Sequence, residues 1–494
     1  MSSDLAKSTT LFLSFLLLFG SGIAVALFRA DPNPWVSFLL VLTPPLLVFG
    51  VQRFPAAFIP PVIFAGQFKT KAAEGVDASD PTFLLLALLF VVTCVHLFFF
   101  FVQARGVTLR YLFAGQWKVI RWFLLLELLV AFSYLHTSSP EYGATLALKF
   151  LTIGLFLFLV PLLLFRDERD LRHFALATLA LAVPLALYRV FVTLTSSAGA
   201  TEDITQIGAG HLIGMTILLI VNYPVTENQW LRKLIFLTFP LLTAGLMAAD
   251  ARGPAFACLA LLGVSIFKGQ GSRFFSGTLA KVGILVMVLA VVGFTVIKMT
   301  STGNRRVSQK RAEIIQLLSG GTPTGGIAAR LFGYSGAISG FSRHPLLGLG
   351  AGGSRAYLAT YHGPFGLTGA DLELKYPHNV VLQVAAEQGI LGLAVLLAFL
   401  WSSYKTMRRL STDTGGRLSC FLWIFLFDLF CMMVSGDLDN WRAVWLWCGV
   451  ALAVSRMLAT KAIPAQVSAV DHHVERVPAR RVGFRGVPQS TFSR

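Results

Sequence analysis

Long apolar runs recur along almost the whole chain. Most of them are about 17 to 25 residues long, which is the length that a helix needs to cross the hydrocarbon core of a bilayer. Only 13% of the 494 residues are charged, whereas soluble domains carry about 25%. One very large soluble core would need far more polar surface than this chain has. The sequence therefore predicts an all-α, polytopic membrane protein.

The apolar runs predict about 12 to 14 transmembrane helices. Residues 54–68 are either a short span or a re-entrant segment, because prolines interrupt them. The expected spans lie at 11–28, 36–51, 83–102, 119–135, 145–165, 171–193, 209–224, 231–249, 254–268, 279–298, 378–401, 418–434 and 441–458. We divide the chain into an N-terminal transmembrane bundle (1–298), a loop with short helices (299–377), C-terminal transmembrane helices (378–458) and a basic tail that we expect to be disordered (459–494).

The loops between these spans alternate in charge. Short loops that are rich in Lys and Arg face the cytoplasm. The basic loops lie at 105–121, 166–172, 232–233, 268–273 and 405–417, and the acidic or neutral loops at 136–142, 196–210, 249–253 and 435–440. This pattern predicts a cytoplasmic C-terminus and places residues 299–377 on the outer face. The net charge of +17 lies between membrane spans, so nucleic acid is a poor explanation for it.

The one long loop is basic although it is predicted to lie outside. Residues 299–377 carry eight Lys or Arg and three Asp or Glu. Long loops are exempt from the positive-inside rule, so an anionic ligand is the simplest reason for the charge. Within the loop, residues 303–321 have the pattern of an amphipathic helix that lies on a membrane surface or packs on the rest of the loop. Arg330 belongs to a second, more apolar helix at 328–341, where an anion contact would explain it.

A polar, glycine-rich segment at 343–353 precedes Pro377, His378 and Asn379. The backbone amides around its glycines either face phosphate oxygens or form a tight turn. Pro377 suits the start of a helix, so we expect His378 and Asn379 in its first turn. The positive end of the helix dipole favours a neutral imidazole, which accepts a proton at pH 7. The alternative is a histidine that only caps the helix.

Further ionisable residues lie in short turns or inside the spans. Arg252 lies in an outer turn at 250–254, where it either binds an anion or pairs with Asp250. Intramembrane ionisable groups are costly and are candidates for function. Four of them fall in or near spans: His96, Glu127, Glu387 and Asp428. No carboxylate cluster, Walker motif or Gly-x-Ser-x-Gly is present, so we expect neither a metal nor a cofactor.

Taken together, these motifs resemble the O-antigen ligase and O-antigen polymerase superfamily of bacterial envelope proteins. The matching residues are His-Pro-Leu-Leu-Gly-Leu-Gly at 344–350, Pro-His-Asn at 377–379 with Leu382, Glu-Gln-Gly-Ile-Leu-Gly at 387–392 and the segment 437–441. The match is strongest over about 240–455. Two departures are Ala251, where the family often has serine, and residues 331–334, where a tryptophan often follows the loop arginine.

The resemblance implies an inverting, metal-independent glycosyltransferase of the bacterial inner membrane. Its donor would be a glycan on undecaprenyl diphosphate, and its active site would face the periplasm. The family's catalytic histidine falls on His378, and its two diphosphate-binding arginines fall on Arg252 and Arg330. A ligase transfers the glycan to a lipid A–core sugar, and a polymerase transfers it to another lipid-linked repeat unit. We favour the ligase.

We expect supporting roles for four more residues near these motifs: Arg355, Asn379, Glu387 and Asp437. The expected partners are the lipid-linked donor, the acceptor and membrane lipids. A transporter or flippase of lipid-linked glycans is the rival of a different class, since such folds often show repeats and broken helices at the midplane. The chain shows no repeat, and its polar residues gather at one surface instead.

Overall fold

The computed structural model describes residues 53–65, 81–103, 113, 115–195, 206–268, 325–363, 374, 376–438 and 442–474. Across these segments the chain folds into helices and forms no strand, which confirms the all-α prediction. The helices are η1 (Pro55–Phe58), α3 (Pro60–Phe64), α4 (Pro81–Gln103), α6 (Trp117–Ser133), η4 (Tyr134–His136), α7 (Pro140–Lys149), η5 (Phe150–Gly154), α8 (Leu155–Leu164), α9 (Glu168–Thr195), α10 (Gln206–Asn222), α11 (Gln229–Ala248), α12 (Arg252–Phe267), α15 (Gly325–Arg343), α16 (Gly353–Thr360), α18 (Val380–Asp413), α19 (Ser419–Ser435) and α20 (Arg442–Val474).

Six helices in this part of the chain are long and apolar enough to cross a membrane, and five shorter apolar helices accompany them. They fall where the apolar runs predict spans. Within the predicted segment 54–68, the described residues 54–65 form the short helices η1 and α3, as the three prolines of that segment lead one to expect. The predicted spans 11–28, 36–51 and 279–298 and the amphipathic segment 303–321 lie outside the described residues. The total of about 12 to 14 spans therefore stays a prediction.

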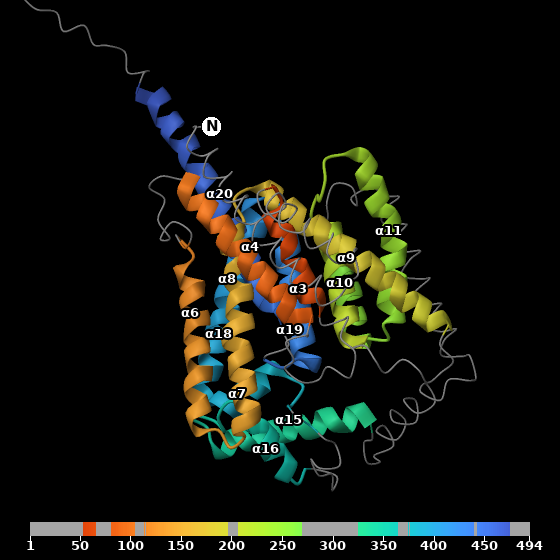
Figure 1. The fold of residues 1–494 in the computed structure, drawn as a ribbon, viewed down its shortest axis with the longest axis vertical. Coiled ribbons are helices and arrows are strands. Elements are labelled where there is room, and N and C mark those ends of the chain that lie inside the picture. The colour runs from red at the N-terminus through yellow and green to blue at the C-terminus, as the bar shows by residue number, and fades with distance from the viewer. Residues whose placement is uncertain are drawn as a thin grey trace, which may run out of the picture.

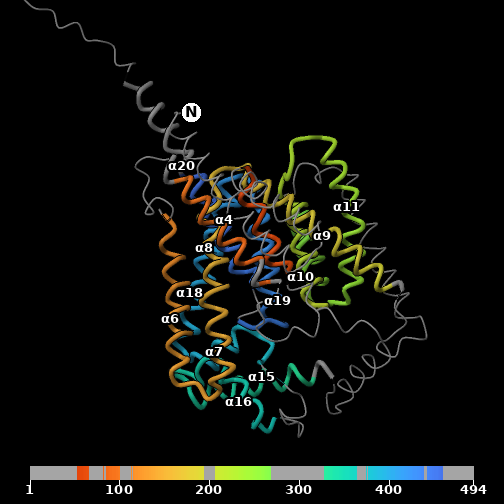
Figure 2. The backbone as a smooth tube through the Cα atoms, viewed as in Figure 1, coloured from red at the N-terminus to blue at the C-terminus, as the bar shows by residue number. Residues whose placement is uncertain are grey.

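The spans form a bundle with two further helices, α15 and α16, across one end (Figure 1). Helix α6 packs on α18 and α8 packs on α20, while α10 packs on α11, α12 and α19. Helices α15 and α16 lie across the end of the bundle at which α6 ends and α7 and α18 begin (Figures 1 and 2). The segment between α12 and α18 thus covers one end of the bundle with its described helices.

The basic loops and the acidic or neutral loops are predicted to lie at opposite ends of the bundle. At one end, Arg417 pairs with Glu168, and Arg172 pairs with Glu227 at 2.6 Å; these residues belong to or adjoin the basic loops. At the other end, the Thr137 hydroxyl donates to the Ala351 carbonyl at 2.7 Å. These contacts lie at opposite ends of the bundle, but the alternation of the loops in charge stays a prediction. Which end faces the periplasm stays a prediction.

Two contacts hold α20 close to α8. A Cβ at Gly449 of α20 would lie 2.1 Å from the Phe158 carbonyl oxygen of α8, so glycine allows the two helices to approach closely, as small residues do in membrane bundles. Nearby, the buried Arg456 donates to the Leu162 and Phe165 carbonyls at 2.7 and 2.6 Å. These carbonyls lie at the C-terminal end of α8, where helix carbonyls lack partners. Helix α20 continues to Val474, into the segment from 459 for which the sequence predicts disorder.

Candidate functional site

His378 lies just before α18 and not in its first turn. The helix begins at Val380, and Asn379 is its N-cap, since the Asn379 side chain accepts a hydrogen bond from the Leu382 amide at 3.0 Å. Asparagine is among the best N-caps because its oxygen satisfies an amide that the helix leaves unpaired. The expected placement of His378 and Asn379 in the first helical turn is therefore wrong: the helix begins at Val380, two residues after the expected start of the span at 378.

The backbone at His378 has an uncommon conformation. Among the described residues, only His378 (φ 58°) and Asp250 (φ 53°) are non-glycine residues with positive φ. Such backbone costs on the order of 1–3 kcal/mol and gathers at functional sites. One of the two is the predicted catalytic residue, and the other lies two residues before Arg252. Both places are ones for which the sequence predicts chemistry.

The C-terminal end of α19 holds the elements around His378 together. From α15, Arg330 Nε donates to the Val434 carbonyl at 3.1 Å, and Tyr334 Oη donates to the Met433 carbonyl at 3.2 Å. From the start of α18, Asn379 Nδ2 donates to the same Met433 carbonyl at 3.0 Å. The last carbonyls of a helix lack partners and carry partial negative charge. They therefore accept an arginine, a tyrosine and an amide, and they bring α15 and α18 to one place.

The electrostatics of His378 favour its neutral form. Burial lowers the pKa of its imidazole below the ordinary value of 6.5, and the positive charge of Arg330 lowers it further. The Tyr376 ring packs edge-on against the imidazole, with ring centroids 4.6 Å apart. A neutral imidazole accepts a proton at pH 7, and a neighbouring guanidinium stabilises negative charge. The pair can thus serve a reaction in which a proton leaves and an anion forms.

Arg252 approaches the same end of α19 from a different helix. It is the first residue of α12, and its side chain is exposed. A Cβ on the next residue, Gly253, would lie 3.7 Å from Val434 Cγ1, and Val434 is also the residue whose carbonyl binds Arg330. No ion pair joins Arg252 to Asp250 in the part of the chain that the structure describes. The fold therefore brings both predicted arginines to the C-terminal end of α19.

The glycine-rich segment is a clasp and not a phosphate loop. The amides of Leu349 and Gly350 donate to the Ala386 and Glu387 carbonyls at 2.8 and 2.9 Å, and the Ile390 amide donates to the Pro345 carbonyl at 2.8 Å. The two expectations for this segment were a phosphate-facing loop and a tight turn. The tight turn is correct, because the backbone amides of this segment donate to groups within the protein. The segment 345–353 fixes itself to the kink of α18 at Gly389, where φ is 64°.

Glu387 supports this clasp from within α18. Its side chain is fully buried and accepts from the Gly352 amide at 3.0 Å and from Gln383 Nε2 at 3.4 Å. Gln383 in turn accepts from the Leu438 amide at 3.0 Å, next to the buried Asp437. A chain of polar contacts thus runs from the clasp through α18 to the segment before α20. It joins Glu387 to the segment that contains Asp437.

The comparison with known families agrees with this geometry. A family model described as O-antigen ligase matches residues 237–397, about a third of the chain. These residues are an O-antigen ligase domain. The domain contains Arg252, Arg330, His378 and the clasp, and it implies a membrane glycosyltransferase of the ligase or polymerase type that acts on lipid-linked glycans. No curated protein matches the chain.

Not every predicted residue of the O-antigen ligase domain gathers around His378. Arg355 of α16 is exposed, and its guanidinium carbon lies 5.2 Å from the centroid of the Tyr142 ring of α7. The contacts of the described residues do not join it to His378 or to either of the other two arginines. Arg355 therefore lies at the same end of the bundle but faces the turn between α6 and α7.

Three residues that contact predicted residues or their partners were absent from the sequence-based expectation. Tyr334 follows Arg330 by four residues, and Gln383 precedes Glu387 by four, so each pair shares a helix face. This spacing is a signal that the sequence contains. His211 of α10 contacts Asp428 of α19; the rule for intramembrane ionisable groups that selected Asp428 applies to His211 too.

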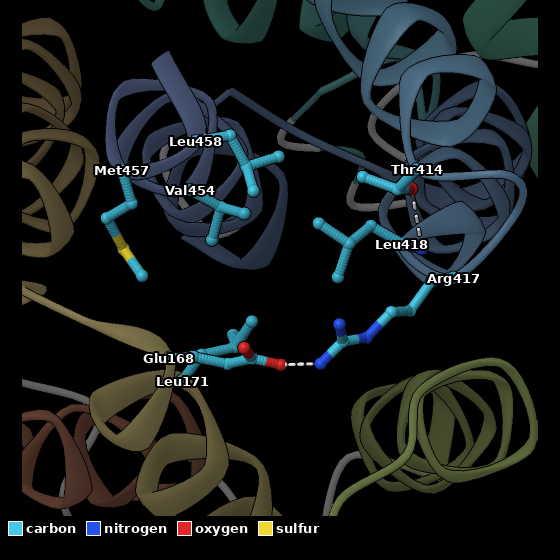
Figure 3. Close-up of a pocket in the computed structure, with 8 residues that line it drawn as sticks. All are labelled: Glu168, Leu171, Thr414, Arg417, Leu418, Val454, Met457 and Leu458. Atoms are coloured by element: carbon cyan, nitrogen blue, oxygen red, sulfur yellow. Dashed lines mark hydrogen bonds and ion pairs between the residues drawn. The ribbon is translucent and has the colours of Figure 1, made fainter. Parts of the chain in front are cut away.

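A cavity of about 180 Å³ lies at the opposite end of the bundle from the candidate site around His378. Glu168 and Arg417 face each other across its rim, and Val454, Met457 and Leu458 of α20 form an apolar wall (Figure 3). Thr414, Arg417 and Leu418 follow the C-terminal end of α18, whereas His378 precedes its N-terminal end. The cavity is thus separated from His378 by the length of α18 and is not part of the candidate site.

Proposed function

We propose that this protein transfers a glycan from undecaprenyl diphosphate to an acceptor sugar hydroxyl on the periplasmic side of the bacterial inner membrane. The single observation that carries the proposal is the position of His378. It lies beside Arg330, at the end of the bundle to which Arg252 also comes, within an O-antigen ligase domain. A neutral base with one guanidinium group nearby, and a second at the same end of the bundle, suits the displacement of a diphosphate by a hydroxyl.

The reaction that we propose is a single displacement. His378 takes the proton of the acceptor hydroxyl as its oxygen attacks the anomeric carbon. The bond from that carbon to the donor's diphosphate oxygen breaks, and undecaprenyl diphosphate leaves with the electron pair, so the anomeric configuration inverts. Negative charge grows on the diphosphate during this step, and Arg252 and Arg330 stabilise it by charge-assisted hydrogen bonds. No metal or organic cofactor takes part.

The neighbouring polar residues support these three in our proposal. Asn379 fixes the start of α18 and thereby the backbone that carries His378. Glu387 holds the clasp, and Asp437 lies behind α18. The contacts of α19 orient the Arg330 side chain, since Val434 and Ser435 accept from it at 3.1 and 3.4 Å. Arg355 is exposed at the same end, where it could contact an anionic part of a large glycan substrate.

The orientation in this proposal follows from the loops. The end of the bundle with the clustered basic loops faces the cytoplasm, where positively charged short loops are retained, and the C-terminus lies there too. The end with His378 then faces the periplasm. Apolar faces of the spans hold the polyprenyl tail and contact membrane lipids. We favour lipid A–core as the acceptor; a polymerase that extends a lipid-linked repeat unit uses the same chemistry at the same residues.

The test is glycan transfer by the purified full-length protein. It is incubated with undecaprenyl-diphosphate-linked glycan, with and without lipid A–core, and compared with His378→Ala and with His362→Ala. His362 is exposed at the same end of the molecule and has no proposed role, so its variant is the matched control. Transfer should be lost in His378→Ala and kept in His362→Ala.

The products separate the remaining alternatives. Product on lipid A–core indicates a ligase, and longer lipid-linked chains formed without that acceptor indicate a polymerase. Full transfer by a folded His378→Ala variant would contradict the general-base role. A lack of transfer by the wild type, in the presence of an active control enzyme, would favour a transporter of lipid-linked glycans.

A further inference from the structure

Two ionisable side chains meet inside the bundle, away from the residues of the proposed mechanism. His211 Nε2 of α10 lies 2.5 Å from Asp428 Oδ1 of α19, and both side chains are buried. The Phe427 ring stacks on the imidazole, with centroids 5.3 Å apart and planes within 7°. Ionisable groups inside a membrane span are costly and need a reason. The residues next to His211 on α10 and next to Asp428 on α19 indicate that reason.

On the α10 side, the pair is next to the turn that carries Arg252. Gly210 directly precedes His211, and a Cβ on it would lie 2.5 Å from Ala251 Cβ. Ala251 in turn directly precedes Arg252. The helix and the turn are therefore in contact without room for a methyl group between them. A slide or rotation of α10 would displace Arg252.

On the α19 side, the pair is on the helix that holds the other half of the site. Asp428 precedes Val434 by six residues, less than two helical turns. The Val434 carbonyl binds Arg330, and the Met433 carbonyl binds Asn379 next to His378. The second oxygen of Asp428, Oδ2, has no hydrogen-bond partner among the described residues, so His211 is the partner that holds this carboxyl. The two residues thus join α10 to α19 near the site.

We propose that His211 and Asp428 are positioning residues that set the spacing between Arg252 and Arg330, and hence the fit of a diphosphate between them. A shift of α10 would move Arg252, because Gly210 contacts Ala251. A shift of α19 would move Arg330, because the Arg330 side chain donates a hydrogen bond to the Val434 carbonyl. The His211–Asp428 contact is the polar link between these two helices. The inference rests on the proposed function only in its choice of a lipid diphosphate as the ligand.

The experiment measures both transfer and the binding of undecaprenyl diphosphate itself by the full-length protein. His211→Asn and Asp428→Asn should each raise the donor KM and weaken diphosphate binding by roughly ten- to hundredfold, because a displacement of about 1 Å has consequences of that size. The KM of the acceptor should not change. The exchanged variant, His211→Asp with Asp428→His, restores the pair and should recover most of the affinity.

Two controls separate positioning from general stability. Thr216→Val alters a buried side chain of the same helix whose hydroxyl bonds only within α10, to the Leu212 carbonyl at 2.8 Å; it should bind as the wild type does. In an Arg252→Ala background, His211→Asn should add little further loss of affinity, because the arginine that it positions is gone. If the His211–Asp428 pair only stabilised the fold, His211→Asn would lower the affinity in the Arg252→Ala background by the same factor as in the wild type.

The outcomes that overturn the inference are distinct from those that overturn the function. Unchanged diphosphate binding in a folded His211→Asn or Asp428→Asn variant would overturn the positioning role, whatever the transfer assay gives. So would a full, independent loss in the Arg252→Ala background. If the single variants do not fold, an exchanged variant that folds but does not bind undecaprenyl diphosphate would also overturn the positioning role. If the wild type binds the diphosphate but transfers no glycan, the proposed function fails while the positioning role is still decided by binding.

Discussion

Replacing Gly389 by alanine should release the clasp that the glycine-rich segment makes with α18. Gly389 has φ 64° and ψ −159°, a region that is essentially limited to glycine and costs other residues about 1–3 kcal/mol. The new Cβ would also lie 2.2 Å from the Leu346 carbonyl oxygen, so backbone must move, at a further cost of about 1–3 kcal/mol. The Ile390–Pro345 hydrogen bond of 2.8 Å lies directly beside this contact.

The sum, about 2 to 6 kcal/mol, is a large part of a typical folding free energy of about 5–15 kcal/mol. We expect a thermal midpoint several degrees lower for Gly389→Ala in detergent micelles and a marked loss of glycan transfer at a temperature at which the protein is still folded. Transfer should fall because the clasp fixes the N-terminal part of α18, which begins beside His378.

Two glycine variants isolate the cause. Gly415 also has positive φ, 58°, but nothing lies within 4 Å of an added Cβ, so Gly415→Ala should cost only about 1–2 kcal/mol. Gly263 is helical and has the same open space, so Gly263→Ala should be neutral or stabilising by up to about 1 kcal/mol. If Gly389→Ala melts and transfers like Gly415→Ala, the close approach to Leu346 does not matter and the argument is wrong.

Three further predictions concern charged groups. In the reaction that we propose, the neutral imidazole of His378 is the base, so transfer should be lost as the pH falls through its pKa, which burial and then Arg330 hold below 6.5. Arg330→Gln should raise that pKa and move the acid limb of the pH–rate profile to higher pH. Arg252→Ala should raise the donor KM and leave the acceptor KM unchanged, as measured by steady-state transfer. Arg456→Met removes the donor from two carbonyls at the end of α8 and should destabilise the protein by about 2–4 kcal/mol in chemical denaturation, without a change in transfer per folded molecule.

Most of the helical architecture could be predicted because bilayer thickness imposes a length on each apolar run. Within the described residues, every expected span corresponds to a helix. The ends were less predictable. The end of α18 at Asp413 lies 12 residues beyond the expected span at 401, because its polar last turns continue as helix outside the apolar run. Periodicity of apolar residues cannot report a polar helix extension.

The sequence identified the chemical types at the site better than their contacts. Charge in unexpected places singled out Arg252 and Arg330, and these residues do approach the end of one helix. The start of α18 was misplaced because proline and asparagine both signal a helix start, and only the observed Asn379–Leu382 contact decides between them. The role of the glycines as a clasp was also hidden, since it depends on a backbone partner 37 residues away, between Leu349 and Ala386.

The end of α19 has a consequence for how this protein can change over time. Arg330, Tyr334 and Asn379 bind the carbonyls of Met433 and Val434 and not their side chains. The amino acids at these two positions can therefore be exchanged while the contacts persist. A single-residue insertion or deletion in α19 is different, because it turns the following carbonyls by about 100° around the helix axis. Substitutions at Met433 and Val434 should thus be tolerated, and changes in the length of α19 should not.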